Sequence, residues 1–293
     1  MDVLTLNYND ANSTIQFVNH IKKYDIISHI LIVDNCSTDD SYQKFQLLSQ
    51  KEKKIILLRT PYNGGYGYGN NYGMRYLSER FSSRYVLQCN PDVIIDEDVI
   101  QALEQFLVAH SDYAIVAPFM LDKEGEKVPY SAFPLATKWQ YIWSLDILCN
   151  KFLHLNTYDN LVGISVPYKR VDAVAGSLIM YDLKKMIHIG MYDENIFLYC
   201  EEMSLGLKLK AAGYKTALLP QQTFIHNHSV SIDKTFKTNL SKRKLLVNSK
   251  LYVIKNFYKA NILEHFIAIC LSRLSFFEIQ LISVLKIIKN SIL

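Results

Sequence analysis

The sequence has few cysteines and no paired cysteine motif. The five cysteines are scattered along the chain: Cys36, Cys89, Cys149, Cys200 and Cys270. A disulfide framework and a zinc site are therefore not expected, and the pattern suits a reducing cytosol. Low-complexity runs are also absent, and charged residues make up 20% of the chain against 49% hydrophobic residues. These values exclude gross disorder and predict a chain that buries a substantial core.

No long uninterrupted apolar run is present either. The amino-terminal residues lack a basic segment followed by an apolar stretch, so no secretory signal is expected. The most apolar segment, 262–285, is interrupted by Glu264, His265, Arg273 and Glu278. Because a membrane span needs about 20 mostly apolar residues, we expect a buried or membrane-surface helix here and not a span.

Charge is divided unevenly along the chain. Residues 234–293 carry 11 Lys or Arg against two Glu, a net charge of +9, whereas the rest of the chain has a net charge of −5. A basic, apolar tail predicts an anionic partner, and a phospholipid surface is the obvious candidate. We therefore expect a cytoplasmic protein held at the inner face of the cell membrane by a basic amphipathic helical extension, 233–293, with no nucleic-acid partner.

Short apolar runs alternate with amphipathic stretches over the first 120 residues. Strands are expected at 3–6, 30–33, 55–58, 85–88 and 114–117, and helices at 15–22, 41–48, 69–80 and 98–109. This alternation predicts an α/β fold with a mainly parallel sheet flanked by helices. A further strand is expected at 171–180, and the chain after Asn227 is expected to be helical.

Polar clusters follow four of the predicted strands, at 7–9, 34–39, 63–69 and 90–92. Ligands bind beyond the carboxyl ends of such strands, so we expect these clusters to lie on one edge of the sheet. Asp34 can accept the ring N–H of a pyrimidine base, or its cluster can simply cap the next helix. The glycines of 63–69 allow backbone to approach a ligand, or form a flexible turn. Their spacing matches neither a P-loop nor a Rossmann fingerprint.

Carboxylates and histidines supply the remaining chemistry. Asp92 can bind Mg²⁺ or Mn²⁺ that bridges donor phosphates, or belong to an ordinary turn. Glu201 and Glu202 can divide the work of deprotonating a hydroxyl and orienting a substrate, or merely occupy the first turn of a helix. His226 and His228 point to opposite faces of an extended segment, so at most one faces the site, where it can bind a metal or a diphosphate.

In this order, the segments resemble glycosyltransferase family 2, especially its bacterial rhamnosyltransferase-like branch. The resemblance covers about residues 1–231 and rests on Asn7-Tyr8-Asn9, 33–39, 63–71, 90–92, 192–202 and His226 to Ser231. It implies a GT-A domain over 1–232, with a nucleotide-sugar-binding half, 1–118, and an acceptor and catalytic half, 119–232. It also implies an inverting hexosyl- or rhamnosyltransferase that uses a UDP- or dTDP-sugar in bacterial surface polysaccharide assembly (capsule, O-antigen or exopolysaccharide). The acceptor would be a lipid-linked glycan.

The resemblance further implies roles for individual residues. Asp34 would bind the base. The nucleotide pocket would be lined by Asn35, Gly65 and Asn71, with Thr5 and Asn7 on its floor. Asp92 would bind Mg²⁺ or Mn²⁺, with Asn90 in place of the first Asp of the family's metal motif, and His226 would contact the metal or the diphosphate.

The general base departs from the family pattern. Glu202 stands where the family has an Asp, one methylene shorter, and Glu201 is the reserve candidate. Ser204 replaces a further Asp. A catalytically inactive member that acts as a scaffold subunit is therefore an alternative. A sugar nucleotidyltransferase is a second alternative, although 7–12 contains neither the Gly nor the Lys of its usual loop.

Aromatic residues gather in the less regular middle of the chain, 119–170. Trp139, Tyr141 and Trp143 can stack on the faces of acceptor sugars, or can equally form core or an oligomer contact. A homo-oligomer is thus compatible with the sequence.

Overall fold

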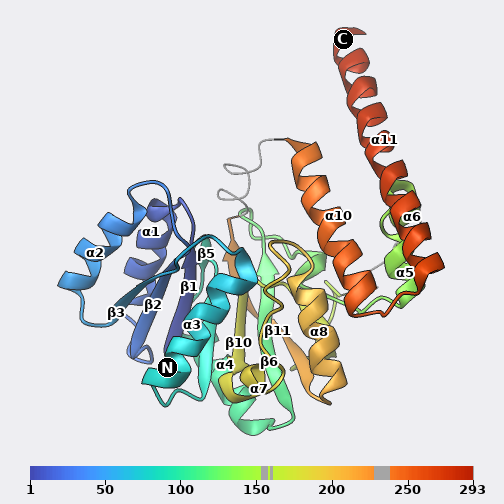
Figure 1. Cartoon of the computed structure of the whole chain (residues 1–293). Coiled ribbons are helices and arrows are strands. Elements are labelled where there is room, and N and C mark those ends of the chain that lie inside the picture. The colour runs from blue at the N-terminus through green and yellow to red at the C-terminus, as the bar shows by residue number, and fades with distance from the viewer. Residues whose placement is uncertain (153–157, 159–160, 228–237, 293) are drawn as a thin grey trace.

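A computed structural model describes residues 1–152, 158, 161–227 and 238–292, and side chains up to residue 280. A nine-stranded mixed sheet forms its centre, in the order β3-β2-β1-β4-β10-β6-β11-β5 with β8 paired to β11 (Figure 1). The strands are β1 Asp2–Asn7, β2 His29–Asp34, β3 Ile55–Arg59, β4 Tyr85–Cys89, β5 Val93–Ile94, β6 Tyr113–Leu121, β8 Lys169–Val171, β10 Leu178–Asp182 and β11 Lys215–His226. Strands β1 to β4, β6 and β11 share one direction and the other three oppose it, which confirms a mixed, mainly parallel sheet.

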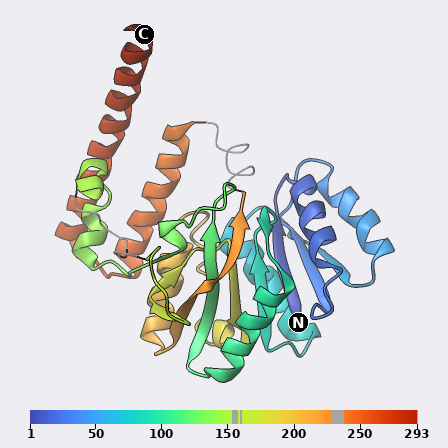
Figure 2. The same cartoon turned by 180° about the vertical axis from the view of Figure 1, so that it is seen from behind.

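Helices cover both faces of the sheet (Figures 1 and 2). One core lies under α1 Ala11–Ile21, α2 Ser41–Lys51 and α4 Glu97–Ala109. The other lies under α3 Tyr66–Arg80, α7 Leu183–His188 and α8 Glu201–Ala211. Every strand and helix expected in the first 120 residues is present, although α1 and α3 begin earlier than expected, at Ala11 and Tyr66.

The expected single strand at 171–180 is wrong. The chain instead forms the end of β8, then β9 Ala173–Val174, which pairs with β7 Ala132–Phe133 beside the short helix η1 Pro129–Ser131, and then β10. The break at 175–177 has a physical cause. There the backbone bonds other parts of the chain, because Ser177 accepts from the amide of Asn90 and Ala175 donates to Ser131.

The expected helical tail is present as α10 Asn239–Asn256 and α11 Ile262–Ile292. Both helices pack against α5 Lys138–Trp143, and a third apolar cluster joins them to Ile196 and Met203. Beside α5 lies α6 Ile147–Phe152, whose first amide donates to Glu278 of α11. Within the described ranges, no helix combines the length and apolarity that crossing a membrane requires. The expected boundary at 232/233 falls among undescribed residues, and the division into domains stays a prediction.

Candidate active site

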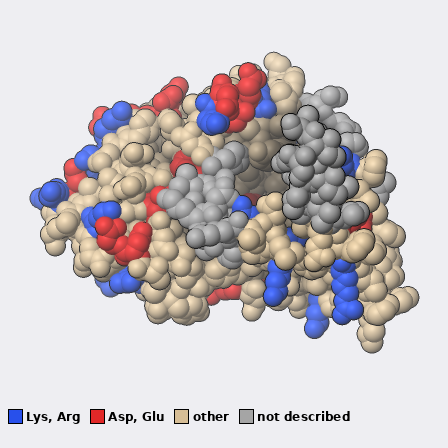
Figure 3. Space-filling model, turned by 90° about the horizontal axis from the view of Figure 1, so that it is seen from above, with Lys and Arg blue, Asp and Glu red and all other residues tan. Residues whose placement is uncertain are grey.

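The polar clusters meet at the carboxyl edge of the sheet, as the sequence predicts. Asn7 and Asp34 end the neighbouring strands β1 and β2 in register, and the Asn7 amide donates to Oδ1 of Asp34 over 3.1 Å. Asn35 then reaches the glycine-rich segment, where its amide donates to the Gly65 carbonyl over 3.1 Å. Seen from above, the surface at this end of the molecule has a recess beside the residues drawn in grey (Figure 3). Residues from three successive β–α connections therefore form one polar surface.

Asp34 is enclosed by the residues around it. Its Oδ2 accepts from the Ser37 amide over 3.1 Å, and the Arg59 guanidinium lies 3.6 Å away. The side chain is fully buried, so the cluster organises the turn after β2 as well as offering a carboxylate. Thr5, one strand position below Leu6, is also fully buried, and its hydroxyl has no hydrogen-bond partner among the described residues. A base-binding role for Asp34 and a floor role for Thr5 remain predictions.

The glycine-rich segment, 63–69, packs against the acidic segment, 192–202, and is not a flexible turn. Gly65 has φ +90°, and a Cβ atom there would overlap the backbone of Phe197. From Tyr66 onward the chain is helical, and Gly67 and Gly69 let α3 lie close to Tyr192 and to the sheet. Gly65 is thus required by a close backbone approach, but the approaching backbone belongs to the protein itself.

Asn71 makes the same connection one turn later. Its amide donates to the Tyr192 carbonyl over 3.0 Å and to Glu194 over 2.9 Å, and its Oδ1 accepts from the Tyr192 amide. The side chain is buried and fully engaged. The structure therefore places Asn71 at the joint between the two halves of the chain, and its expected role in lining a nucleotide pocket stays untested.

Glu201 and Glu202 begin α8, as the first-turn interpretation predicts. Glu201 is buried, and its Oε1 has no hydrogen-bond partner in the described part of the chain. Glu202 is partly exposed, and its Oε1 accepts from the Gly176 amide over 3.2 Å. Burial raises the pKa of Glu202 and, together with the charge of Glu202, holds the pKa of Glu201 well above its usual value. Of the two carboxylates, Glu202 is therefore the one accessible from the surface.

A tyrosine–glutamine network lies beside this carboxylate. Gln88, at the buried centre of β4, donates to the hydroxyls of Tyr66 over 2.9 Å and Tyr192 over 3.0 Å. The Tyr66 hydroxyl donates to the Gly176 carbonyl over 2.7 Å. Burial raises the pKa of both tyrosines, so both hydroxyls keep their protons. Sequence reasoning missed Tyr66, Gln88 and Gly176, although a glutamine inside an apolar strand is a usable signal because buried polar groups need partners.

Asp92 and His226 are brought together across 134 residues. Strand β5 pairs with the end of β11, and Nε2 of His226 lies 3.2 Å from Oδ1 of Asp92. A carboxylate beside an imidazole suits Mn²⁺ or Mg²⁺ when phosphate or water oxygens complete the shell. Residues 1–152, 158, 161–227 and 238–280 contain no group of three metal-ligating side chains beyond such a pair. His228 lies outside the described residues.

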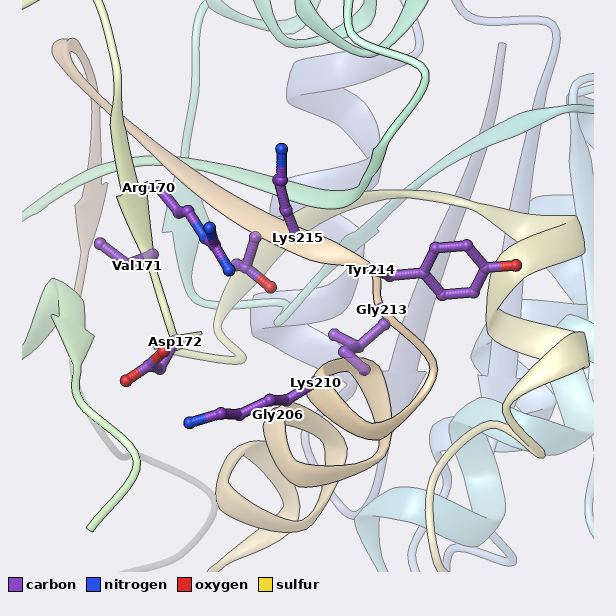
Figure 4. Close-up of a pocket in the computed structure, with 10 residues that line it drawn as sticks. Arg170, Val171, Asp172, Gly206, Lys210, Gly213, Tyr214 and Lys215 are labelled. Atoms are coloured by element: carbon purple, nitrogen blue, oxygen red, sulfur yellow. The ribbon is translucent and has the colours of Figure 1, made fainter.

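A separate cavity of about 70 Å³ opens at the opposite end of α8 (Figure 4). Arg170, Lys210 and Lys215 line it together with Asp172. The cavity is not the candidate active site. Its lining includes none of the residues predicted to bind the donor or the metal or to act as the general base.

The sequence profile described as Glycosyl transferase family 2 matches residues 2–158, more than half of the chain. The chain belongs to glycosyl transferase family 2. Its relatives include the rhamnosyltransferase WbbL of Escherichia coli (strain K12), 23% identical over an alignment of 255 residues that covers 80% of this chain and 93% of that protein. The low-salt glycan biosynthesis hexosyltransferase Agl10 of Haloferax volcanii is 25% identical over 78% of this chain and 68% of its own length. This chain is a glycosyltransferase.

A third relative is the N-acetylglucosaminyl-diphospho-decaprenol L-rhamnosyltransferase of Mycobacterium tuberculosis (strain CDC 1551 / Oshkosh). It is 24% identical over 70% of this chain and 68% of its own length.

Solved structures share the architecture of this chain. The mannosyltransferase PcManGT from Pyrobaculum calidifontis, in complex with GDP-Man and Mn²⁺, aligns with a TM-score of 0.58 over 93% of this chain and 69% of that chain, at 12% identity. GalNAc-T7 with UDP, GalNAc and Mn²⁺ aligns with a TM-score of 0.59 over 78% of this chain, which spans less than half of that one (44%), at 13% identity. This member of glycosyl transferase family 2 thus has the GT-A fold that the sequence predicts.

Proposed function

We propose that this glycosyltransferase inverts the anomeric centre of a sugar as it moves that sugar from a nucleotide diphosphate to an acceptor hydroxyl. One observation carries the proposal. The short segment 175–177 between β9 and β10 connects the candidate base to the candidate metal site. The Gly176 amide donates to Glu202, and the carbonyl of the next residue, Ser177, accepts from the amide of Asn90. Asn90 lies two residues before Asp92. The proposed base and the proposed metal ligand are therefore both connected to the adjacent residues Gly176 and Ser177.

In this mechanism the Glu202 carboxylate accepts the acceptor proton as the hydroxyl oxygen attacks the anomeric carbon. The nucleotide diphosphate leaves from the opposite face, so a single displacement inverts that centre. Mg²⁺ or Mn²⁺, held by Asp92 and His226, would neutralise charge on the leaving diphosphate. Burial raises the pKa of Glu202 and so strengthens it as a base. Its partial exposure leaves the carboxylate open to an acceptor.

The donor would lie along the polar edge formed by Asn7, Asp34 and Asn35. Asp34 would accept the ring N–H of the base in UDP or dTDP, and the unpartnered Thr5 hydroxyl would lie beneath it. Solved chains of the same fold contain UDP or GDP-Man, which supports a nucleotide-sugar donor in general. Gly65 and Asn71 would shape this pocket from behind, through their contacts with the acidic segment.

The acceptor would be a lipid-linked glycan of bacterial surface polysaccharide assembly. A curated relative from Mycobacterium tuberculosis is named for a diphospho-decaprenol substrate, which supports a lipid-linked acceptor. Of the aromatic residues expected to stack on it, Trp139 and Trp143 are exposed and Tyr141 is buried, so only the tryptophans can meet a sugar face.

An apolar face on α5, α6 and α11 supports a peripheral membrane position. These helices run alongside one another, joined by the Lys138–Glu264 ion pair and the bond from Ile147 to Glu278 (Figures 1 and 2). The apolar face consists of exposed residues: Trp139, Trp143, Leu148, Phe152, Ile262, Leu263, Phe266, Leu274 and Phe277. Together with the +9 charge of residues 234–293, this face suits an anionic leaflet. The same face could instead form the contact of a homo-oligomer. Binding to vesicles would distinguish a membrane-binding face from an oligomer contact.

The proposed reaction is tested by incubating the chain with a panel of UDP-, dTDP- and GDP-sugars and Mn²⁺. Transfer or donor hydrolysis that disappears with a chelator, and that yields the opposite anomer, supports the proposal. A chain that binds UDP but consumes no donor would instead be the scaffold member of the family. Retention of the anomeric configuration would exclude the single displacement at Glu202.

A further inference from the structure

The backbone just before the two carboxylates has an uncommon conformation. Tyr199 and Cys200 both adopt positive φ, 68° and 70°, although neither is a glycine. Left-handed conformations are unfavourable for residues with a Cβ atom and persist only where surrounding contacts hold them. The contacts that hold segment 192–200 therefore also determine where Glu202 points.

On one side this segment is held by α3 of the donor half. The Tyr66 amide donates to the Phe197 carbonyl over 2.9 Å, and Asn71 binds both backbone groups of Tyr192. These bonds fix the beginning and the middle of the segment.

On the other side it is held by α10, from the carboxyl-terminal helices. The Ser249 hydroxyl donates to the Leu198 carbonyl over 2.7 Å, one residue before the left-handed pair. The Tyr252 hydroxyl donates to Oδ2 of Asp193 over 3.1 Å. Ser249 and Tyr252 are three residues apart, so they share one face of α10. Val253 and Ile254 of α10 also belong to the same apolar cluster as Ile196, inside the segment, and Met203, three residues after it.

We propose that α10 is a positioning element of the catalytic site: Ser249 and Tyr252 hold segment 193–198 so that Glu202 keeps its bond to the Gly176 amide. The proposal rests on the proposed role of Glu202 as base. It gives the carboxyl-terminal helices a task in catalysis that is separate from membrane binding. The residues involved touch no substrate and act through the backbone that carries the base.

Displacement of Glu202 has a specific consequence for proton affinity. Burial raises the pKa of Glu202, and the backbone amides of Glu202 itself and of Gly176 lower it by stabilising the carboxylate. The other titratable groups that interact with Glu202 are Glu201 on the same helix, Cys200 just before it, Tyr66 on α3, Tyr192, and Tyr141 on α5. None of them donates a hydrogen bond to Glu202 in the described structure, so loss of the Gly176 bond raises the pKa of the base. The acidic limb of the rate profile then moves to higher pH.

The experiment compares the double variant Ser249→Ala/Tyr252→Phe with the matched control Ser272→Ala/Tyr214→Phe. Ser272 is a buried serine of α11 whose hydroxyl donates to the Ile269 carbonyl of its own helix, and Tyr214 follows the carboxyl end of α8. Turnover is measured with UDP-glucose or dTDP-rhamnose, whichever the unmodified chain consumes. UDP binding with Mn²⁺ is followed by calorimetry, and folding by the melting temperature.

We expect kcat of the double variant to fall about tenfold or more, with the dissociation constant of UDP within about twofold of the unmodified value. The acidic limb of the rate profile should move to higher pH. The control should keep the kcat and the pH profile of the unmodified chain. Equal turnover in variant and control, or a fall in kcat that tracks the melting temperature without a shift of the acidic limb, overturns the proposal. Full activity of Glu202→Gln would instead overturn the assignment of the base, which separates the two failures.

Discussion

Gly176 and Glu202 fit together without spare room. The Gly176 amide donates to Oε1 of Glu202 over 3.2 Å, and a Cβ atom built on Gly176 would lie 3.1 Å from that same oxygen. It would also lie 3.2 Å from the Tyr66 hydroxyl, which donates to the Gly176 carbonyl. A residue with a side chain at this position must therefore displace the carboxylate or the tyrosine.

Gly176→Ala should accordingly slow turnover while leaving donor binding intact. We expect kcat to fall about tenfold, because the carboxylate or the tyrosine must move by a few tenths of an ångström and misplacement of a reacting group slows the reaction. UDP binding with Mn²⁺ should change little. Gly163→Ala is the matched control, since a Cβ there meets nothing within 4 Å and φ is not in the left-handed region. A Gly176→Ala enzyme with normal kcat would contradict the dependence of catalysis on the exact position of Glu202.

The two carboxylates should separate in their effects on catalysis. Glu202→Gln removes the proton acceptor, and we expect kcat to fall about 10²- to 10⁴-fold. Glu201→Gln should lower kcat far less, because Glu201 is buried away from the substrate. Steady-state rates of both variants, with UDP binding as the control for donor affinity, decide the assignment. A larger loss in Glu201→Gln would reverse it.

The donor half could be predicted from sequence because its signals are local. Each strand is followed at once by its polar cluster, so the meeting of Asn7 and Asp34 follows from a parallel sheet alone. The roles of Gly65 and Asn71 were not predictable in the same way. Their partners, Phe197 and Tyr192, lie more than 120 residues later, and no periodicity within the chain encodes that contact.

The same limit explains the errors near the base. The apolar run 171–180 has the composition of one strand, but distant partners such as Asn90 break it at 175–177. In the tail, the charge count also includes Lys250, which is buried and donates to the carbonyl and hydroxyl of Ser144 over 2.8 Å. Burial lowers the pKa of this lysine to about 8. Composition gives the sum of charges but not which of them face the interior.

Removing the charge of Glu201 should stabilise the fold at high pH only. Burial raises its pKa well above the ordinary 4.5. Folding therefore favours the protonated form, and this stabilisation is complete below pH 4.5 and is lost as the pH rises through the raised value. Gln cannot ionise, so Glu201→Gln should melt at a higher temperature than the unmodified chain at pH 8 and at a similar temperature at pH 4. The melting temperature should rise by about 2–4 °C for each kcal/mol gained in the free energy of unfolding.

Thermal unfolding at both pH values checks this prediction. Glu202→Gln serves as the comparison and should gain less, because the Gly176 amide already stabilises the Glu202 carboxylate. An equal gain for Glu201→Gln at pH 4 and pH 8 would mean that packing, not ionisation, causes it.

Asp92→Ala should weaken donor binding only when metal is present. The carboxylate lies beside His226 and would hold Mg²⁺ or Mn²⁺ against the donor diphosphate. We expect the affinity for UDP to fall about tenfold or more with Mn²⁺ present, and to change little in a chelator. Calorimetry under both conditions measures the difference. A loss of affinity that is the same with and without metal would indicate collapse of the β5–β11 pairing and not loss of a ligand.

The apolar face should bind anionic vesicles. Phe266 and Phe277 lie on one side of α11 and are 61% and 65% exposed. Burying a Phe side chain is worth about 1.5–3 kcal/mol, so Phe266→Ser/Phe277→Ser should lower the vesicle partition constant by about tenfold or more. The matched control is Leu47→Ser/Val108→Ser, which removes side chains of 60% and 64% exposure from α2 and α4. Sedimentation with phosphatidylglycerol vesicles measures the bound fraction, which should fall as salt rises because the basic residues contribute. If both double variants bind equally well, or if the unmodified chain does not sediment and instead forms dimers through this face, the membrane position is wrong.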